Sequence, residues 1–342
     1  MEQRRYNVGL DFIRIFAMLA VIWVHLTVYL PVPDRIRPFF TWGGAGVQCF
    51  FALSGFLACH SFENRQKIGV YYKKRAIRIL PAYYVAVIGA MLFHQFILKD
   101  VTADIFGLGW LRYFLGLNTV LPSTNYDLWN NTYGLWTMSC FIWFYIMAPF
   151  IFKWVRSLKS AAYFFGLSFV CSIAWKLVMN SIFSRIDGIE SLDVLTGASP
   201  FGVLYQFAIG IMVYFSLKEG KAYKGIVLLS VISVFGLVLN RNAFIWCSLC
   251  GLMIIAHENV ETHISAKVQR VVRAIGKESF HVYLSHLLSF AVAWSIANTV
   301  FKDSSIVKYS CWALISAMLV VVLCCVMTAC ERIVGAMIRR KK

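Results

Sequence analysis

Residues 10–25 read LDFIRIFAMLAVIWVH, an apolar run fit for a membrane-spanning helix that nevertheless carries Asp11, Arg14 and His25. An ionised side chain at the centre of a lipid-facing helix costs roughly 2.5–3.5 kcal/mol on insertion scales. Three such groups in one span must therefore face protein or water. The rest of the chain must supply their partners.

Composition places the whole chain in the membrane. Hydrophobic residues make up 60% of the 342 residues and charged residues 14%, whereas soluble domains average roughly 45–50% and about 25%. A soluble protein of this length could not bury so much apolar surface. The ten cysteines lie almost entirely within apolar runs, which favours packing roles over disulfide or metal chemistry.

The chain is expected to form one all-α, polytopic membrane domain over residues 1–342. A membrane-spanning helix needs about 17–25 mainly apolar residues. Such windows occupy about 8–330, and a short basic tail, 331–342, follows them. The ten windows are 8–30, 43–61, 79–98, 134–152, 161–183, 201–217, 225–240, 242–257, 279–300 and 306–330.

The distribution of Lys and Arg sets the expected orientation, because cytoplasmic loops are enriched in them. With a cytoplasmic N-terminus, the inside segments carry 23 of the 33 Lys and Arg residues and the outside segments carry 8. Both termini are therefore expected in the cytoplasm, and residues 99–133 outside, in a multi-pass protein of the cell membrane. This asymmetry explains most of the net charge of +17. The charge therefore gives no support to a nucleic-acid partner, and the membrane lipids expected as partners follow from the apolar spans.

Arg14 and His25 are expected on one face of the first span. Their separation of eleven residues corresponds to about 1100°, which is roughly 20° past three full turns, and to about 16 Å along the axis. Asp11 lies three residues before Arg14, a spacing that suits an ion pair. From these residues alone, two interpretations stay open. Asp11 and Arg14 form a structural pair beside a packing histidine, or His25 is a desolvated, neutral imidazole that acts as a base.

Four motifs occur in order along the chain. The first is Leu-Asp-x-x-Arg followed by ten residues and then His, within 10–25. The others are FFALSGF at 50–56, RAIRILPAYY at 75–84 and IGKESFHVYLSH at 275–286. This set resembles the membrane acyltransferase-3 family, bacterial integral-membrane O-acyltransferases of surface glycans. The resemblance runs from about residue 7 to 330.

The resemblance implies transfer of an acyl group, most simply acetyl, from cytoplasmic acyl-CoA to a hydroxyl of a lipid-linked or surface glycan. The seven histidines form no His-x-x-x-His or comparable ligand set, so no metal is expected. It implies that His25 is the catalytic base and that Arg14, Arg75 and Arg78 bind the donor, since the arginine fork fits phosphate bidentately. As bare residues, Arg75 and Arg78 are equally well explained as basic anchors at the cytoplasmic mouth of the third span.

The resemblance also suggests supporting residues within the spans: Asp11, Ser54, Tyr283 and His286. Ser54 either lines an acyl tunnel or, with Gly55, lets two helices approach closely, and Tyr283 and His286 are similarly balanced between the site and the packing. In the outer segment, Tyr126 and Trp129 either hold the acceptor sugar or anchor the loop at the headgroups.

One feature departs from the family pattern. Many members of the family carry a Glu in the fourth span where this chain has Phe141, so no carboxylate from that span assists His25. Pro81 is expected in the first turn of the third span, where its missing N–H is tolerated.

Other functions also fit these residues. On physical grounds alone, a transporter or flippase for a lipid-linked glycan or small polar metabolite explains the buried charges equally well. An amino-acid-binding membrane sensor or permease domain is a third class.

Overall fold

The structure, a computed structural model, describes residues 8–63, 67–99, 111–120, 134–183, 196–257, 264–303 and 305–340. Within these ranges the regular elements are helices and no strand occurs, which confirms the all-α prediction. The short elements are α2 (Arg37–Thr41), η1 (Trp42–Gly44), η2 (Phe93–Leu98) and α5 (Leu111–Phe114). The longer helices are α1 (Val8–Tyr29), α3 (Ala45–Glu63), α4 (Ile68–Leu92), α7 (Trp136–Trp154), α8 (Leu158–Phe183), α10 (Pro200–Lys218), α11 (Ala222–Val238), α12 (Asn242–Ala256), α13 (Ala266–Val300) and α14 (Ile306–Arg340).

Each of the ten predicted spans overlaps one of these longer helices. Eight of the described helices are long and apolar enough to cross a membrane, and α11 and α12 are shorter apolar helices. A tight turn joins α11 to α12, and its Asn240 adopts a φ of 52°, a left-handed conformation that Asn tolerates better than most residues. The chain is therefore a multi-pass membrane protein.

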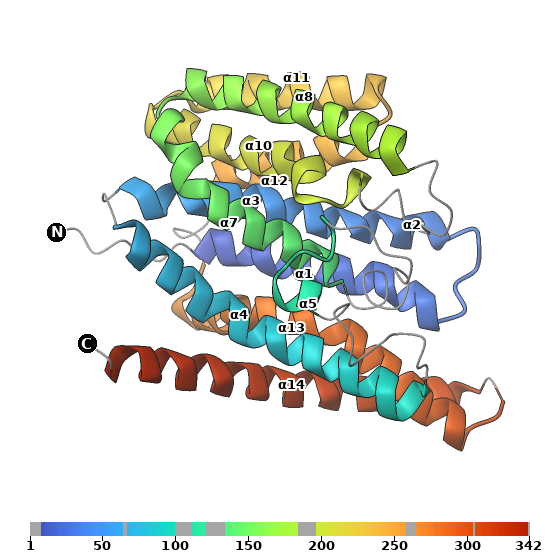
Figure 1. The fold of residues 1–342 in the computed structure, drawn as a ribbon. Coiled ribbons are helices and arrows are strands. Elements are labelled where there is room, and N and C mark those ends of the chain that lie inside the picture. Colours follow the sequence, from blue (N-terminus) through green and yellow to red (C-terminus); the bar gives the residue numbers. More distant parts are fainter. Residues whose placement is uncertain are drawn as a thin grey trace.

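α1 lies at the centre of the bundle (Figure 1). It packs against α3 and α13, while α10 packs against α3 and α8, and α14 packs against α13 and α4. The first residue of α1 and the last turn of α14 lie at the same end of the bundle. We call this the basic end, because the segments that join helices there carry most of the Lys and Arg residues.

The outer helices present apolar surface to their surroundings. α10 buries most of its side chains, whereas α8 and α14 bury few. On α8, Leu167, Val170 and Leu177 are all more than 60% exposed. Contiguous apolar surface of this kind marks contact with a membrane or a partner rather than with water, and lipid is the surrounding that these helices fit.

Three boundaries differ from the sequence prediction. α13 begins at Ala266, well before the predicted span of 279–300. α4 begins at Ile68, so Pro81 lies inside the helix and not in its first turn. A proline is tolerated there because neighbouring groups in a membrane bundle can satisfy the freed backbone. α14 continues to Arg340, so residues 331–340 extend the last helix instead of forming a separate tail. Lys73 Nζ donates to the Ile338 carbonyl at 3.2 Å, which ties this extension to α4.

The contact between α1 and α13 depends on Gly276. A Cβ at this position would lie 2.6 Å from Cβ of Asp11, a distance that packed atoms do not reach. Asp11 is fully buried, so it cannot move aside into solvent. Glycine inside a helix is unfavourable by roughly 1 kcal/mol relative to alanine. Here its missing side chain lets α1 and α13 approach closely.

Gly276→Ala is expected to lower the thermal unfolding temperature of the purified protein, because the new methyl group must push α1 away from α13. Gly166→Ala on α8 is the matched control, since a Cβ there meets nothing within 4 Å and alanine is the better helix former. Unfolding in detergent, followed by intrinsic fluorescence, measures both. Equal midpoints for the two variants would contradict this account of the α1–α13 contact.

Candidate functional site

A cavity of about 340 Å³ lies between α1, α3, α4, α7 and α13, toward the basic end. Small-molecule sites in proteins measure roughly 300–1,000 Å³. Much of the wall is apolar, as at Leu57, Met138 and Phe280. Five residues predicted from the sequence also line it: Arg14, Ser54, Arg75, Arg78 and Tyr283. The cavity thus combines four cationic residues, the three arginines and Lys277, with apolar walls, a lining that suits an anionic ligand with an uncharged extension.

Arg14 is held by the carboxylate that the sequence spacing predicts. Its Nη1 donates to Oδ1 of Asp11 at 2.5 Å. The Asp11 side chain is fully buried, whereas 29% of the Arg14 side chain is exposed, toward the cavity that it lines. The pair therefore neutralises a carboxylate inside the α1–α13 contact and leaves part of the Arg14 side chain accessible.

Arg75 has a different environment. Its Nη2 donates to Oγ of Ser61 at 2.9 Å, and its guanidinium lies 4.8 Å from the centroid of the Tyr145 ring. In the described part of the chain it forms no ion pair with a carboxylate. Of the three arginines that line the cavity, Arg75 is thus the one whose charge the described residues leave unbalanced.

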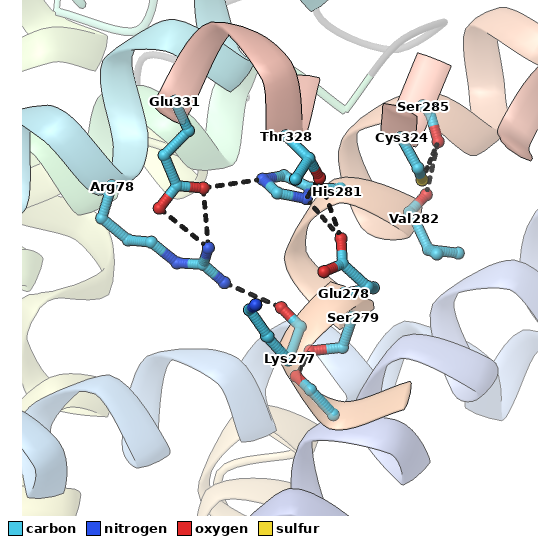
Figure 2. A network of polar contacts seen from close by, with 11 residues as sticks. Arg78, Lys277, Glu278, Ser279, His281, Val282, Ser285, Cys324, Thr328 and Glu331 are labelled. Atoms are coloured by element: carbon cyan, nitrogen blue, oxygen red, sulfur yellow. Dashed lines mark hydrogen bonds and ion pairs between the residues drawn. The ribbon is translucent and has the colours of Figure 1, made fainter. Parts of the chain in front are cut away.

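Arg78 is anchored to two other helices (Figure 2). Its Nη1 donates to both carboxylate oxygens of Glu331 on α14, at 3.0 and 2.8 Å, and its Nη2 donates to the Lys277 carbonyl on α13 at 2.8 Å. The side chain therefore joins α4, α13 and α14 beside the cavity. Its charge is balanced before any ligand binds.

The network continues from Glu331 to His281, a fully buried residue of α13. Nε2 of His281 lies 3.3 Å from Oε2 of Glu331, and its Nδ1 lies 2.8 Å from Oε2 of Glu278 (Figure 2). Oγ1 of Thr328 donates to the same Glu278 oxygen at 3.2 Å. Sequence analysis missed these residues. A usable signal was present in the Glu-x-x-His spacing of 278 and 281, which places both side chains on one helical face.

His25 and His286 form a pair across the α1–α13 contact. Nδ1 of His25 lies 2.9 Å from Nε2 of His286. His286 is buried at 2% exposure, and its Nδ1 lies 2.7 Å from the carbonyl oxygen of Tyr283. Tyr283 lines the cavity one helical turn before His286, so the pair lies just beyond the end of the cavity that is farther from the basic end.

The sequence leaves two roles open for Ser54 and Gly55, lining a cavity and permitting close helix packing, and each residue has one of them. Ser54 lines the cavity, whereas a Cβ on Gly55 would overlap the carbonyl of Phe207 on α10. Gly55 therefore permits the close approach of α3 and α10. Phe141 also lines the cavity, and its ring packs 5.0 Å from the ring of Phe51. At the position where the family pattern led us to look for a carboxylate, this wall is apolar.

Comparison with known protein families gives the same family as the four sequence motifs. The acyltransferase-3 family, described as "Acyltransferase domain", matches residues 7–329. The chain belongs to this family. The match includes both histidines, the three cavity arginines and the Glu278–His281 segment, and it ends just before Glu331.

The chain is also similar to individual known proteins, one of which is named a peptidoglycan O-acetyltransferase. Peptidoglycan O-acetyltransferase OatA of Listeria monocytogenes is 23% identical over 323 residues, which are 83% of this chain and 49% of OatA. Nodulation protein 10 of Rhizobium leguminosarum is 26% identical over 228 residues, 59% of this chain and 58% of that protein. The chain spans less than two thirds of either relative. No solved structure matches it.

Two further predictions concern the outer segment and metal binding. Tyr126 and Trp129 lie outside the described residues, so their proposed contact with an acceptor stays a prediction. Within the described ranges, no group of three His, Cys, Asp or Glu side chains is placed to hold a metal ion.

Arg14→Ala is expected to destabilise the protein by about 3 kcal/mol, since removing one partner of a buried pair strands the other charge. Asp11→Asn in the same chain should recover part of the loss, because the carboxylate left without its cation is then neutral. Thermal unfolding of the single and double variants measures both effects. A double variant no more stable than Arg14→Ala would show that the pair does not carry this stability.

Proposed function

We propose that this protein is an integral-membrane O-acyltransferase that moves an acyl group, most simply acetyl, from acyl-CoA to a hydroxyl of a lipid-linked or surface glycan. The observation that carries the proposal is the succession along α1 and α13. A cavity with three arginines lies toward the basic end, and a histidine pair lies one turn beyond it. Membership of the acyltransferase family supports this chemistry.

The donor is proposed to enter from the basic end. The positive-inside rule assigns this end to the cytoplasm, the compartment of acyl-CoA. Phosphate groups of the donor need cations, and arginine offers them a planar fork of donors. Because Asp11 balances Arg14 and Glu331 balances Arg78, Arg75 is proposed as the strongest phosphate contact. The uncharged arm and the acyl group then follow the wall past Ser54 toward Tyr283.

His25 is proposed as the general base. It removes the proton of the acceptor hydroxyl while that oxygen attacks the thioester carbonyl carbon. The new C–O bond gives a tetrahedral intermediate, which collapses as the C–S bond breaks. The proton on His25 then passes to the departing thiolate, so the products are the acyl ester and free coenzyme A. A positioned base contributes typically 10²–10⁴-fold to such a step.

The acceptor is proposed to approach from the opposite end of the bundle. OatA carries peptidoglycan O-acetyltransferase in its name, and a glycan assembled or displayed outside the cell needs acyl groups that are made inside. The proposal places the base between the two compartments. In this arrangement Tyr126 and Trp129 offer amphipathic rings to the sugar.

Arg75→Ala is expected to weaken binding of acetyl-CoA about ten- to a hundredfold, the usual contribution of a hydrogen bond to a charged group. Arg75→Lys should recover only part of this loss, since an ammonium group lacks the bidentate fork. Lys74→Ala is the matched control: it removes one positive charge from the same turn, but Lys74 is exposed and does not line the cavity. Isothermal titration of the purified variants measures the affinity. Equal affinity of the two alanine variants for acetyl-CoA would show that Arg75 does not bind the donor and only helps to set the membrane orientation.

His25→Ala is expected to lower acyl transfer by about 10²–10⁴-fold without changing the affinity for acetyl-CoA. Membranes that contain the glycan acceptor are incubated with acetyl-CoA labelled in the acetyl group, and the label on the glycan and the free coenzyme A are both measured. A transporter would release no coenzyme A in this assay. A normal transfer rate in His25→Ala would show that His25 is not the catalytic base.

A further inference from the structure

The two nitrogens of His286 both contact protein atoms, and the contacts define its hydrogen positions. Nδ1 lies 2.7 Å from the Tyr283 carbonyl oxygen. A carbonyl oxygen only accepts hydrogen bonds, so Nδ1 of His286 must carry the hydrogen. In the neutral ring Nε2 is then an acceptor. Its neighbour at 2.9 Å, Nδ1 of His25, must therefore donate.

We infer that His286 is a positioning residue that fixes the tautomer and ring orientation of His25, so that Nε2 of His25 carries the lone pair. The inference rests on the proposed function, in which that lone pair removes the acceptor's proton. His286 itself is unsuited to be the base. Its two nitrogens are engaged and its side chain is buried, whereas His25 keeps one nitrogen for the substrate.

Aromatic neighbours keep the His286 ring in place. The Phe290 ring, one turn further along α13, meets it edge-on at a centroid distance of 5.8 Å, and the Tyr283 ring lies 6.0 Å away on the other side. Oγ1 of Thr137 on α7 lies 2.8 Å from the Tyr283 hydroxyl and so holds Tyr283. A ring confined in this way resists the flip that would exchange Nδ1 and Nε2.

The pair also stabilises the charge that forms during transfer. When Nε2 of His25 takes the hydroxyl proton, His25 becomes an imidazolium and its Nδ1–H bond to His286 becomes charge-assisted, hence stronger. The proton that arrives on Nε2 stays there until the thiolate of coenzyme A receives it. No proton has to move onto His286, which keeps its hydrogen bond to the Tyr283 carbonyl throughout.

Two substitutions of similar polarity separate positioning from packing. In His286→Gln, the amide oxygen can occupy about the position of Nε2 and accept from Nδ1 of His25. In His286→Asn, the shorter side chain places its amide near the former Nδ1 and does not reach His25. His286→Ala removes both contacts. The three variants are purified as the full chain, and thermal unfolding verifies that each is folded.

The rate measured is the release of coenzyme A from acetyl-CoA, with the glycan acceptor or with water, at saturating and at limiting donor. His286→Ala and His286→Asn should lower kcat about ten- to a hundredfold, the effect of a lost hydrogen bond to a charged group, and leave the donor KM unchanged. His286→Gln should keep most of the wild-type kcat. A Gln variant as slow as the Asn variant, or an Ala variant with wild-type kcat, would overturn the inference.

A second measurement needs no variant of His286 to fold. In wild-type protein with ¹⁵N-labelled histidine, solid-state NMR distinguishes the tautomers, and the His25 signals are those lost in His25→Ala. The inference requires a protonated Nδ1 and an unprotonated Nε2 on His25; the opposite tautomer contradicts it. Failure of the proposed function looks different, because His25→Ala would then keep full transfer whatever tautomer is found.

Discussion

The close contact between α1 and α13 is the constraint on which the site depends. Gly276 lets the buried Asp11 lie against α13, and Asp11 in turn holds Arg14 at the cavity. Further along the same two helices, His25 meets His286. A shift of α1 along or away from α13 would therefore disturb the arginine and the histidine pair together, although they are about 16 Å apart along the helix axis.

Charge balance explains why the polar residues in this bundle are tolerated and which of them remain available. Arg14 is neutralised by Asp11, and Arg78 by Glu331 within a network that extends through His281 to Glu278 (Figure 2). These pairs keep charge away from lipid and connect the helices around the cavity. Arg75 lacks such a partner among the described residues, so an anionic ligand would complete the balance. This asymmetry among three arginines is the basis for the proposed phosphate contact at Arg75.

Much of this arrangement follows from the sequence. Hydropathy windows locate the ten helices, and helical periodicity places Asp11, Arg14 and His25 along one side of α1. Both arguments succeed because they rest on the geometry of a single helix. The resemblance to the acyltransferase family, confirmed by the match over 7–329, added the candidate residues on other spans.

What the sequence could not give depends on contacts between distant segments. The partner of Arg78 is Glu331, 253 residues further on, and hydropathy alone ends the last span before it. The pairing of His25 with His286 needs the register of α1 against α13, which Gly276 sets through a contact invisible to periodicity. The predicted helix start at Pro81 was wrong for a related reason. Local propensity favours a helix start there, but the surrounding bundle stabilises a helix that continues across Pro81.

The central proposal is that a donor bound at the arginines of the cavity brings its acyl group to His25. A cryo-EM structure of the protein with a non-hydrolysable acetyl-CoA analogue tests this claim most directly. The account predicts donor phosphates against Arg75 and the carbonyl carbon of the analogue beyond Tyr283, next to Nε2 of His25. An analogue bound away from Arg75, or one whose acyl group ends on the basic-end side of Tyr283 with His25 out of reach, would contradict it.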